Sequence, residues 1–152
     1  MTTPDTAIAP VVKTVTVACD PETAFRVFTR EIGAWWPLEQ LSLTGDAAEV
    51  VWEEHEGGAI YEVSGTGERA SWGSVLTWEP PDRVVWAWHV NRPEGVRPTE
   101  VEVCFVSDPE GTRVVLEHRH WDRLPDGAER RDGYVEGWEL VLSGFRAHPG
   151  LV

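Results

Sequence analysis

Two histidines, His118 and His120, stand two residues apart in the apolar segment TRVVLEHRH. If this segment is a strand, alternate side chains share a face, and the two imidazoles lie about 7 Å apart on its apolar side. Such a pair can ligate a metal ion or transfer protons. His89 and Cys104 do not complete a metal-ligand spacing with the pair. We therefore predict no metal site, and we place both histidines toward the interior of the fold.

Recognised catalytic motifs are missing from the sequence. It contains no G-x-S-x-G nucleophile elbow, no H-E-x-x-H metal motif and no glycine loop that would cradle a phosphate. Enzymatic chemistry would then depend on a polar group that faces an apolar interior, and His118 is the best candidate for a general acid or base. We assign no catalytic residue, and name His118 only for the case that the protein is an enzyme.

Nine tryptophans supply more aromatic surface than an ordinary core needs. Large rings line pockets as well as fill cores. Trp86 and Trp88 share one face of the segment RVVWAWHV, where they form either a cavity wall that stacks on a flat ligand or packing for a helix. Trp35 and Trp36 either gate a cavity or cap the core. An aromatic wall and an aromatic core have the same sequence pattern, so both alternatives remain open.

A sheet is expected to hold these side chains in place. Residues 11–18 (VVKTVTVA) predict a first strand. In the next segment Asp20 suits a helix N-cap, Pro21 suits the first helical position and Gly33 ends the helix, with a short helical turn at 32–36. Apolar runs separated by turn residues then predict an antiparallel meander. Its strands are expected at residues 48–54, 59–64, 68–78, 82–90, 99–107 and 112–120.

The C-terminal segment returns to helical spacing. Apolar residues recur at i, i+4, i+7, i+8 and i+11, so one face of a long helix is expected to pack on the sheet. Gly133 and Gly137 weaken the start of this helix, and the segment HPG stops it. The apolar face comprises Tyr134, Trp138, Val141, Leu142 and Phe145.

The composition describes one acidic domain. The 152 residues include 13 basic and 26 acidic side chains, and the net charge of −13 repels nucleic acid and anionic membranes. Residues 1–10 resemble a loose tail, and residues 11–152 are expected to form a single domain. No stretch approaches the length of a membrane span, and no signal-peptide pattern opens the chain. Two isolated cysteines, Cys19 and Cys104, suit a reducing compartment, so we predict a cytoplasmic protein.

Five strings along the chain carry a resemblance to known proteins: DPETAFRVFT, GGAIYEV, GSVLTWEPPDRVVWAW, TRVVLEH and GWELVLSGF. Over residues 11–148 the chain resembles the START-like (SRPBCC, helix-grip) superfamily, and within it the C-terminal domain family of activators of the ninety-kilodalton heat-shock protein ATPase. The resemblance implies an α+β fold. A seven-stranded antiparallel sheet would curve around the long C-terminal helix, with two short helices after the first strand and a cavity between sheet and helix.

Members of this superfamily hold lipids, hormones or polyketide intermediates in that cavity, so the resemblance offers an analogy for function, to which the tryptophan-rich strands and the inward histidines add. We expect a module that binds a hydrophobic small molecule, aromatic or lipid-like, without a cofactor and without nucleic-acid or membrane partners. One alternative is an enzyme of the polyketide cyclase type that uses His118. Another is a chaperone or regulatory module with a packed interior, which acts through a protein partner or as a homodimer. The residues expected to bind the ligand are Trp35, Trp36, Trp86, Trp88, Val103, Phe105, Leu116, His118, His120, Trp138 and Val141.

Overall fold

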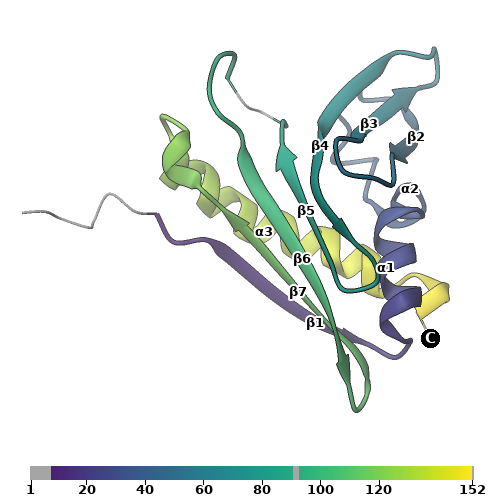
Figure 1. The fold of residues 1–152 in the computed structure, drawn as a ribbon. Coiled ribbons are helices and arrows are strands. Elements are labelled where there is room, and N and C mark those ends of the chain that lie inside the picture. Colours follow the sequence, from purple (N-terminus) through teal and green to yellow (C-terminus); the bar gives the residue numbers. More distant parts are fainter. Residues whose placement is uncertain (1–7, 91–92, 152) are drawn as a thin grey trace, which may run out of the picture.

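Seven strands form one antiparallel sheet, and a long helix runs along its concave face (Figure 1). The computed structural model describes residues 8–90 and 93–151. The elements are β1 (Val11–Val17), α1 (Pro21–Thr29), α2 (Ile32–Trp35), β2 (Ala47–Trp52), β3 (Ala59–Ser64), β4 (Arg69–Glu79), β5 (Arg83–Trp88), β6 (Thr99–Asp108), β7 (Gly111–Arg119), the 3₁₀ turn η2 (Trp121–Arg123), α3 (Gly127–Arg146) and the 3₁₀ turn η3 (Pro149–Leu151).

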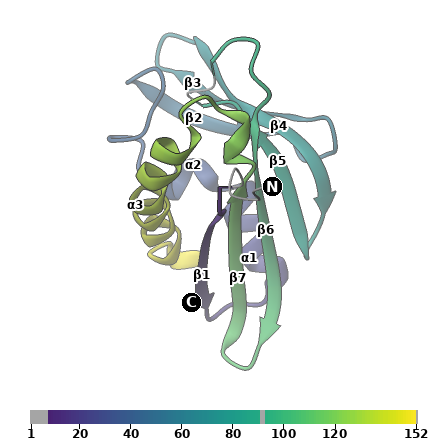
Figure 2. The same ribbon diagram turned by 90° about the vertical axis from the view of Figure 1, so that its left-hand side faces the viewer.

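The strand order is β1-β7-β6-β5-β4-β3-β2, and every neighbouring pair is antiparallel. Strands β2 to β7 follow one another as the predicted meander, and each lies within two residues of its expected limits. The chain crosses from β1 to the opposite edge through α1 and α2. Figure 2, turned by 90°, shows α3 to one side of the sheet, next to β1, β7 and β6. The predicted α+β helix-grip fold is confirmed.

The short helices α1 and α2 close one end of the sheet, beside the C-terminal end of α3 (Figure 1). As predicted, Asp20 caps α1: its carboxylate accepts the backbone N–H of Thr23 at 2.9 Å, and Pro21 opens the helix. Helix α1 ends at Thr29, before the expected stop at Gly33, and the chain turns into the separate helix α2. The turn brings Trp35 and the following loop to the end of the sheet.

Helix α3 begins at Gly127, earlier than the weak start that the sequence suggested near Gly133. The first turn lies close to η2 and carries a local ion pair. A Cβ on Gly127 would lie 1.9 Å from the carbonyl oxygen of Trp121, so only glycine allows this approach. The guanidinium of Arg130 also donates to both carboxylate oxygens of Asp126 at 2.9 Å. Close packing therefore accounts for the glycine at the first position of this helix.

The predicted N-terminal tail falls mostly on residues 1–7, which lie outside the described residues. The last part of that segment is bound to the domain. Ile8 packs against the core, and Arg131 of α3 donates to the backbone carbonyl oxygens of Ala9 at 2.9 Å and Pro10 at 3.1 Å. Residues 8–10 thus contact the domain before β1 begins.

The two faces of the sheet follow the predicted alternation. On β6, Val101, Val103 and Phe105 are buried beneath the helices. On the opposite face, Glu102 accepts hydrogen bonds from Arg83 and from Arg119, the second at 2.6 Å. On β6, the inner face is therefore apolar, and the charged side chains lie on the outer face.

Candidate functional site

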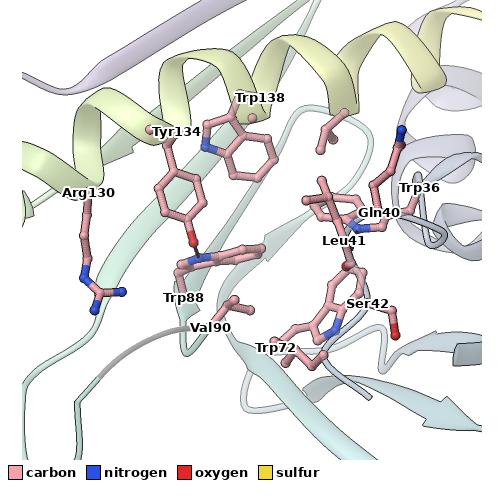
Figure 3. A pocket seen from close by; sticks show the side chains of 14 residues that line it. Trp36, Gln40, Leu41, Ser42, Trp72, Trp88, Val90, Arg130, Tyr134 and Trp138 are labelled. Atoms are coloured by element: carbon pink, nitrogen blue, oxygen red, sulfur yellow. Dashed lines mark hydrogen bonds between the residues drawn. The ribbon is translucent and has the colours of Figure 1, made fainter. Parts of the chain in front are cut away.

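A half-open pocket of about 450 Å³ lies between α3, strands β4 and β5, and the loop that joins α2 to β2 (Figure 3). This volume falls within the range of small-molecule sites. Its lining is mostly apolar. The lining residues are Trp36, Gln40, Leu41, Ser42, Leu43, Trp72, Trp88, Val90, Arg130, Gly133, Tyr134, Gly137, Trp138 and Val141.

Four tryptophans form a continuous aromatic surface in this pocket, which we call the tryptophan wall: Trp36 after α2, Trp72 on β4, Trp88 on β5 and Trp138 on α3. The ring centroids of Trp36 and Trp72 are 4.6 Å apart, those of Trp88 and Trp138 5.6 Å, and those of Trp36 and Trp138 6.0 Å. The rings cover most of one another's surface, and the aromatic surface that remains exposed lies mainly on Trp36 and Trp88. The wall can therefore bind a flat apolar ligand.

Every indole N–H of the tryptophan wall has an acceptor within the protein. Trp88 donates to the hydroxyl of Tyr134 at 2.8 Å (Figure 3), and Trp36 donates to the carbonyl oxygen of Leu41 at 3.3 Å. Trp72 donates to a carboxylate oxygen at 2.8 Å, and Trp138 donates to an imidazole nitrogen at 3.0 Å. These bonds set the orientation of each ring before any ligand arrives. The wall is thus preorganised.

The imidazole that holds Trp138 is His118, which is fully buried. Because Nδ1 accepts the indole N–H of Trp138, the proton lies on Nε2, which donates to the hydroxyl of Thr99 at 2.8 Å. The ring also packs on Trp121, with centroids 4.0 Å apart. Burial lowers the pKa of His118 to about 3, so the imidazole is neutral. Through its hydrogen bond to Trp138, His118 supports the tryptophan wall from the core side.

The carboxylate that holds Trp72 is Glu62 on β3, which is fully buried. It also accepts the hydroxyl protons of Ser42 at 2.6 Å and Thr44 at 2.9 Å, and the backbone N–H groups of Leu43 at 2.8 Å and Thr44 at 2.9 Å. Burial alone would raise the pKa of Glu62, but these hydrogen bonds outweigh it and lower the pKa to about 2. The carboxylate is thus ionised, and it fixes the loop that forms one edge of the pocket.

The structure divides the residues expected to bind a ligand into two groups. Trp36, Trp88, Trp138 and Val141 line the pocket. The others are not among its described lining. Trp35, Trp86, Val103, Phe105, Leu116 and His118 are buried in the core, where the ring of Trp86 meets Phe28 and Trp52.

The predicted inward orientation of His120 is wrong. Strand β7 ends at Arg119, and His120 has a left-handed backbone conformation with φ of 71°. The alternation of the strand therefore does not extend to it. Its side chain is 40% exposed and lies 3.7 Å from a carboxylate oxygen of Glu100, on the outer face of the sheet.

Sequence reasoning missed several lining residues. Trp72 was counted among the tryptophans but was not assigned to the site, although it shares the aromatic character of Trp88. The loop residues Leu41 and Leu43 follow no periodic pattern, so nothing in the sequence placed them at the pocket. Gly133 and Gly137 were read only as weak points of the helix, yet they fall at helical spacing with Tyr134 and Trp138, which is the signal that could have found them.

The described residues were searched for metal-ligand groups and for membrane-spanning helices. Within residues 8–90 and 93–151, no three His, Cys, Asp or Glu side chains are grouped so that they could hold a metal ion. No helix in this part of the chain is long and apolar enough to cross a membrane.

Comparison with known proteins identifies relatives of the chain. Residues 18–149 match the family model described as activator of Hsp90 ATPase homolog 1-like protein. The anthrahydroquino-γ-pyrone synthase Txn09 is 33% identical, with a TM-score of 0.59 over 90% of this chain and 88% of its own. The self-sacrificing resistance protein CalC from Micromonospora echinospora is 31% identical, with a TM-score of 0.68 over 91% of this chain and 92% of its own.

More distant structures share the fold. The Aha1 dimer from Colwellia psychrerythraea is 16% identical, with a TM-score of 0.68 over 91% of this chain and 94% of its own. Comparison of the sequence with curated proteins gives no match.

Proposed function

Because the chain belongs to the family of activator of Hsp90 ATPase homolog 1-like proteins, whose fold supports a ligand-binding module, we propose that its pocket binds a planar, largely apolar small molecule. The matched region, residues 18–149, contains every lining residue of the pocket. The proposed ligand stacks on the tryptophan wall between α3 and the loop after α2.

The preorganised tryptophan wall is the observation that carries this proposal. Its four indole N–H groups are bonded within the protein, so the wall meets a ligand with ring faces and edges. A rigid aromatic surface favours a flat ring system, because stacking needs little reordering on either side. A flexible lipid-like chain would lose more conformational freedom in the same pocket.

The names of two relatives bear on the ligand class and on the activity, and the first supports a planar ligand. Txn09, at 33% identity, is named for a product that joins an anthrahydroquinone to a γ-pyrone, which are flat ring systems. CalC, at 31% identity, is a self-sacrificing resistance protein. The two names describe a synthase and a resistance protein on one fold. The relatives therefore support ligand binding in the pocket, whereas the choice between turnover and binding depends on the residues of this chain.

Those residues favour binding over catalysis. The candidate acid or base, His118, has both ring nitrogens bonded, to Thr99 and Trp138, and a pKa of about 3. A general acid or base needs a reachable atom that exchanges protons near neutral pH. A protein-interaction module would in turn be expected to have a filled interior, whereas this fold holds a ligand-sized pocket.

The proposal predicts that Trp88→Ala weakens binding of 1,8-dihydroxyanthraquinone by about 30-fold, measured by isothermal titration calorimetry. The indole of Trp88 touches Trp36, Trp72 and Trp138, so its loss breaks the middle of the wall. Trp88→Phe keeps a ring and is expected to lose about threefold. Thermal melts of both variants check that they fold.

The control is Trp78→Phe, at a half-buried tryptophan that packs on Phe25 and does not line the pocket. It is expected to bind like wild type. Decanoic acid, a flexible chain, is expected to bind more weakly than the anthraquinone. Equal binding by wild type and a folded Trp88→Ala variant, or preference for the chain, would contradict the proposal.

A further inference from the structure

Four glycines lie in helix α3, and two of them have a packing reason. A Cβ on Gly127 would lie 1.9 Å from the carbonyl oxygen of Trp121, and a Cβ on Gly144 would lie 2.4 Å from the carbonyl oxygen of Trp35. No larger residue fits at either position without moving backbone. These two glycines let α3 approach η2 at one end and α2 at the other.

The other two, Gly133 and Gly137, have no such reason. Apart from the adjacent residues and the nearby backbone of α3 itself, a Cβ at either position would meet no atom within 4 Å, and neither residue has a positive φ. Both line the pocket. Glycine is among the least favourable residues for a helix interior, and alanine would fit here without strain. Folding alone therefore does not account for these two positions.

Because Gly133 and Gly137 have no side chains, they leave part of the surface of α3 uncovered. They are one turn apart, so they lie along one edge of the helix face that also carries Tyr134, Trp138 and Val141. Beside the rings of Tyr134 and Trp138, this edge offers bare helix backbone. A flat ligand stacked on the tryptophan wall can extend over this edge, where a side chain would stop it.

Another side of the pocket, formed by the loop after α2, carries exposed apolar side chains. Leu41 and Leu43, on the loop after α2, line the pocket and are 38% and 43% exposed. Covering such exposed, large apolar side chains with a bound partner lowers the free energy. The pocket is thus bounded by bare backbone on one side and exposed leucines on another, and both edges suit an apolar ring system wider than a single ring.

We infer that Gly133 and Gly137 are specificity-determining residues that admit a fused, multi-ring planar ligand and set its permitted width. The inference rests on the proposed binding function and adds the ligand's size class to it. It implies that the helix keeps two unfavourable residues because the pocket needs the space that their side chains would fill.

The test separates stability from binding in Gly133→Ala and Gly137→Ala. Each variant is expected to raise Tm by about 2 to 4 °C, because alanine favours the helix. Each is expected to weaken binding of the three-ring 1,8-dihydroxyanthraquinone by about tenfold in calorimetry, because the methyl group occupies ligand space. Affinity for phenol, which has a single ring, is expected to change less than twofold.

Two variants in the same helix serve as matched controls. Ser143 is exposed on another face of α3 and does not line the pocket, so Ser143→Ala is expected to raise Tm slightly with unchanged binding. Gly144→Ala is expected to lower Tm, because its Cβ meets the Trp35 carbonyl. The controls distinguish a general effect of helix propensity from an effect of the pocket.

The outcomes separate the two proposals. Wild-type binding of the anthraquinone together with selective loss in Gly133→Ala and Gly137→Ala supports the inference. Wild-type binding with unchanged affinity in both stabilised variants overturns the inference and leaves the proposed function standing. Absence of wild-type binding to both the anthraquinone and phenol overturns the proposed function, and the inference with it.

Discussion

The free energy of unfolding is expected to fall by about 3 kcal/mol as the pH is lowered from 7 to 4, through His118 alone. The side chain is fully buried, and its hydrogen-bond partners, Thr99 and Trp138, are uncharged. Burial lowers its pKa from 6.5 to about 3. The folded protein therefore cannot take up the proton that the unfolded chain binds.

The direction of the effect follows from the two pKa values. Above about pH 6.5 the imidazole is neutral in both states, and the stability is fully present. Between pH 6.5 and 3 only the unfolded chain is protonated at His118, so each pH unit costs about 1.4 kcal/mol. Below the folded pKa no further loss arises from this residue.

Urea unfolding at pH 7, 6, 5 and 4, followed by tryptophan fluorescence, measures this dependence. In His118→Gln the slope between pH 6 and 5 is expected to vanish, although stability at pH 7 also falls because the bond to Trp138 is disturbed. The control is His55→Gln, at an exposed histidine, which should keep the wild-type slope. A slope that survives in His118→Gln would show that the imidazole is not the source.

His118 also shows how far sequence patterns reach. The alternation of Val114, Leu116 and His118 predicted that the imidazole faces inward, and the side chain is buried. Alternation assigns a face to a side chain, but it does not identify hydrogen-bond partners. The bond to Trp138 joins β7 to α3, residues that are 20 positions apart, so only the folded chain shows it.

The pair Trp86 and Trp88 shows a second limit. The sequence placed both rings on one face of a strand, and both are buried there. Trp86 packs in the core and Trp88 lines the pocket. The difference depends on position along the strand relative to α3 and the loop after α2. Periodicity predicts which side a residue faces, whereas the position of the pocket depends on the packing of distant elements.

Glu62 shows where the pattern itself misleads. A glutamate inside a strand is normally expected on the solvent face, yet Ile60, Glu62 and Ser64 form the buried side of β3. The hydrogen bonds from the loop after α2 and from Trp72 allow this burial. Most of those donors lie on the loop after α2, which has no regular spacing, and the alternation of β4 does not identify Glu62 as the partner of Trp72.

Replacing Glu62 with alanine is expected to lower the free energy of unfolding by about 3 to 4 kcal/mol. The substitution leaves the indole N–H of Trp72 and the backbone N–H groups of Leu43 and Thr44 without their acceptor. Trp72 and Leu43 line the pocket. Displacement of these two side chains should therefore also weaken binding of 1,8-dihydroxyanthraquinone by about tenfold. Denaturant unfolding and calorimetry measure the two effects.

The charge of Glu62 can be separated from its shape by Glu62→Gln. The pKa of Glu62 in the folded protein is about 2, below the ordinary value of 4.5. The ionised carboxylate therefore contributes about 3 kcal/mol to the free energy of unfolding above pH 4.5, and this contribution is lost as the pH falls toward 2. Glu62→Gln is expected to lose most of this stabilisation at pH 7 and to lack that acid-dependent step.

Glu49→Ala, at an exposed glutamate of neighbouring β2, should stay within about 0.5 kcal/mol of wild type. If Glu62→Ala cost no more than this control, the carboxylate would not be the anchor that holds the loop and Trp72 in place for a ligand.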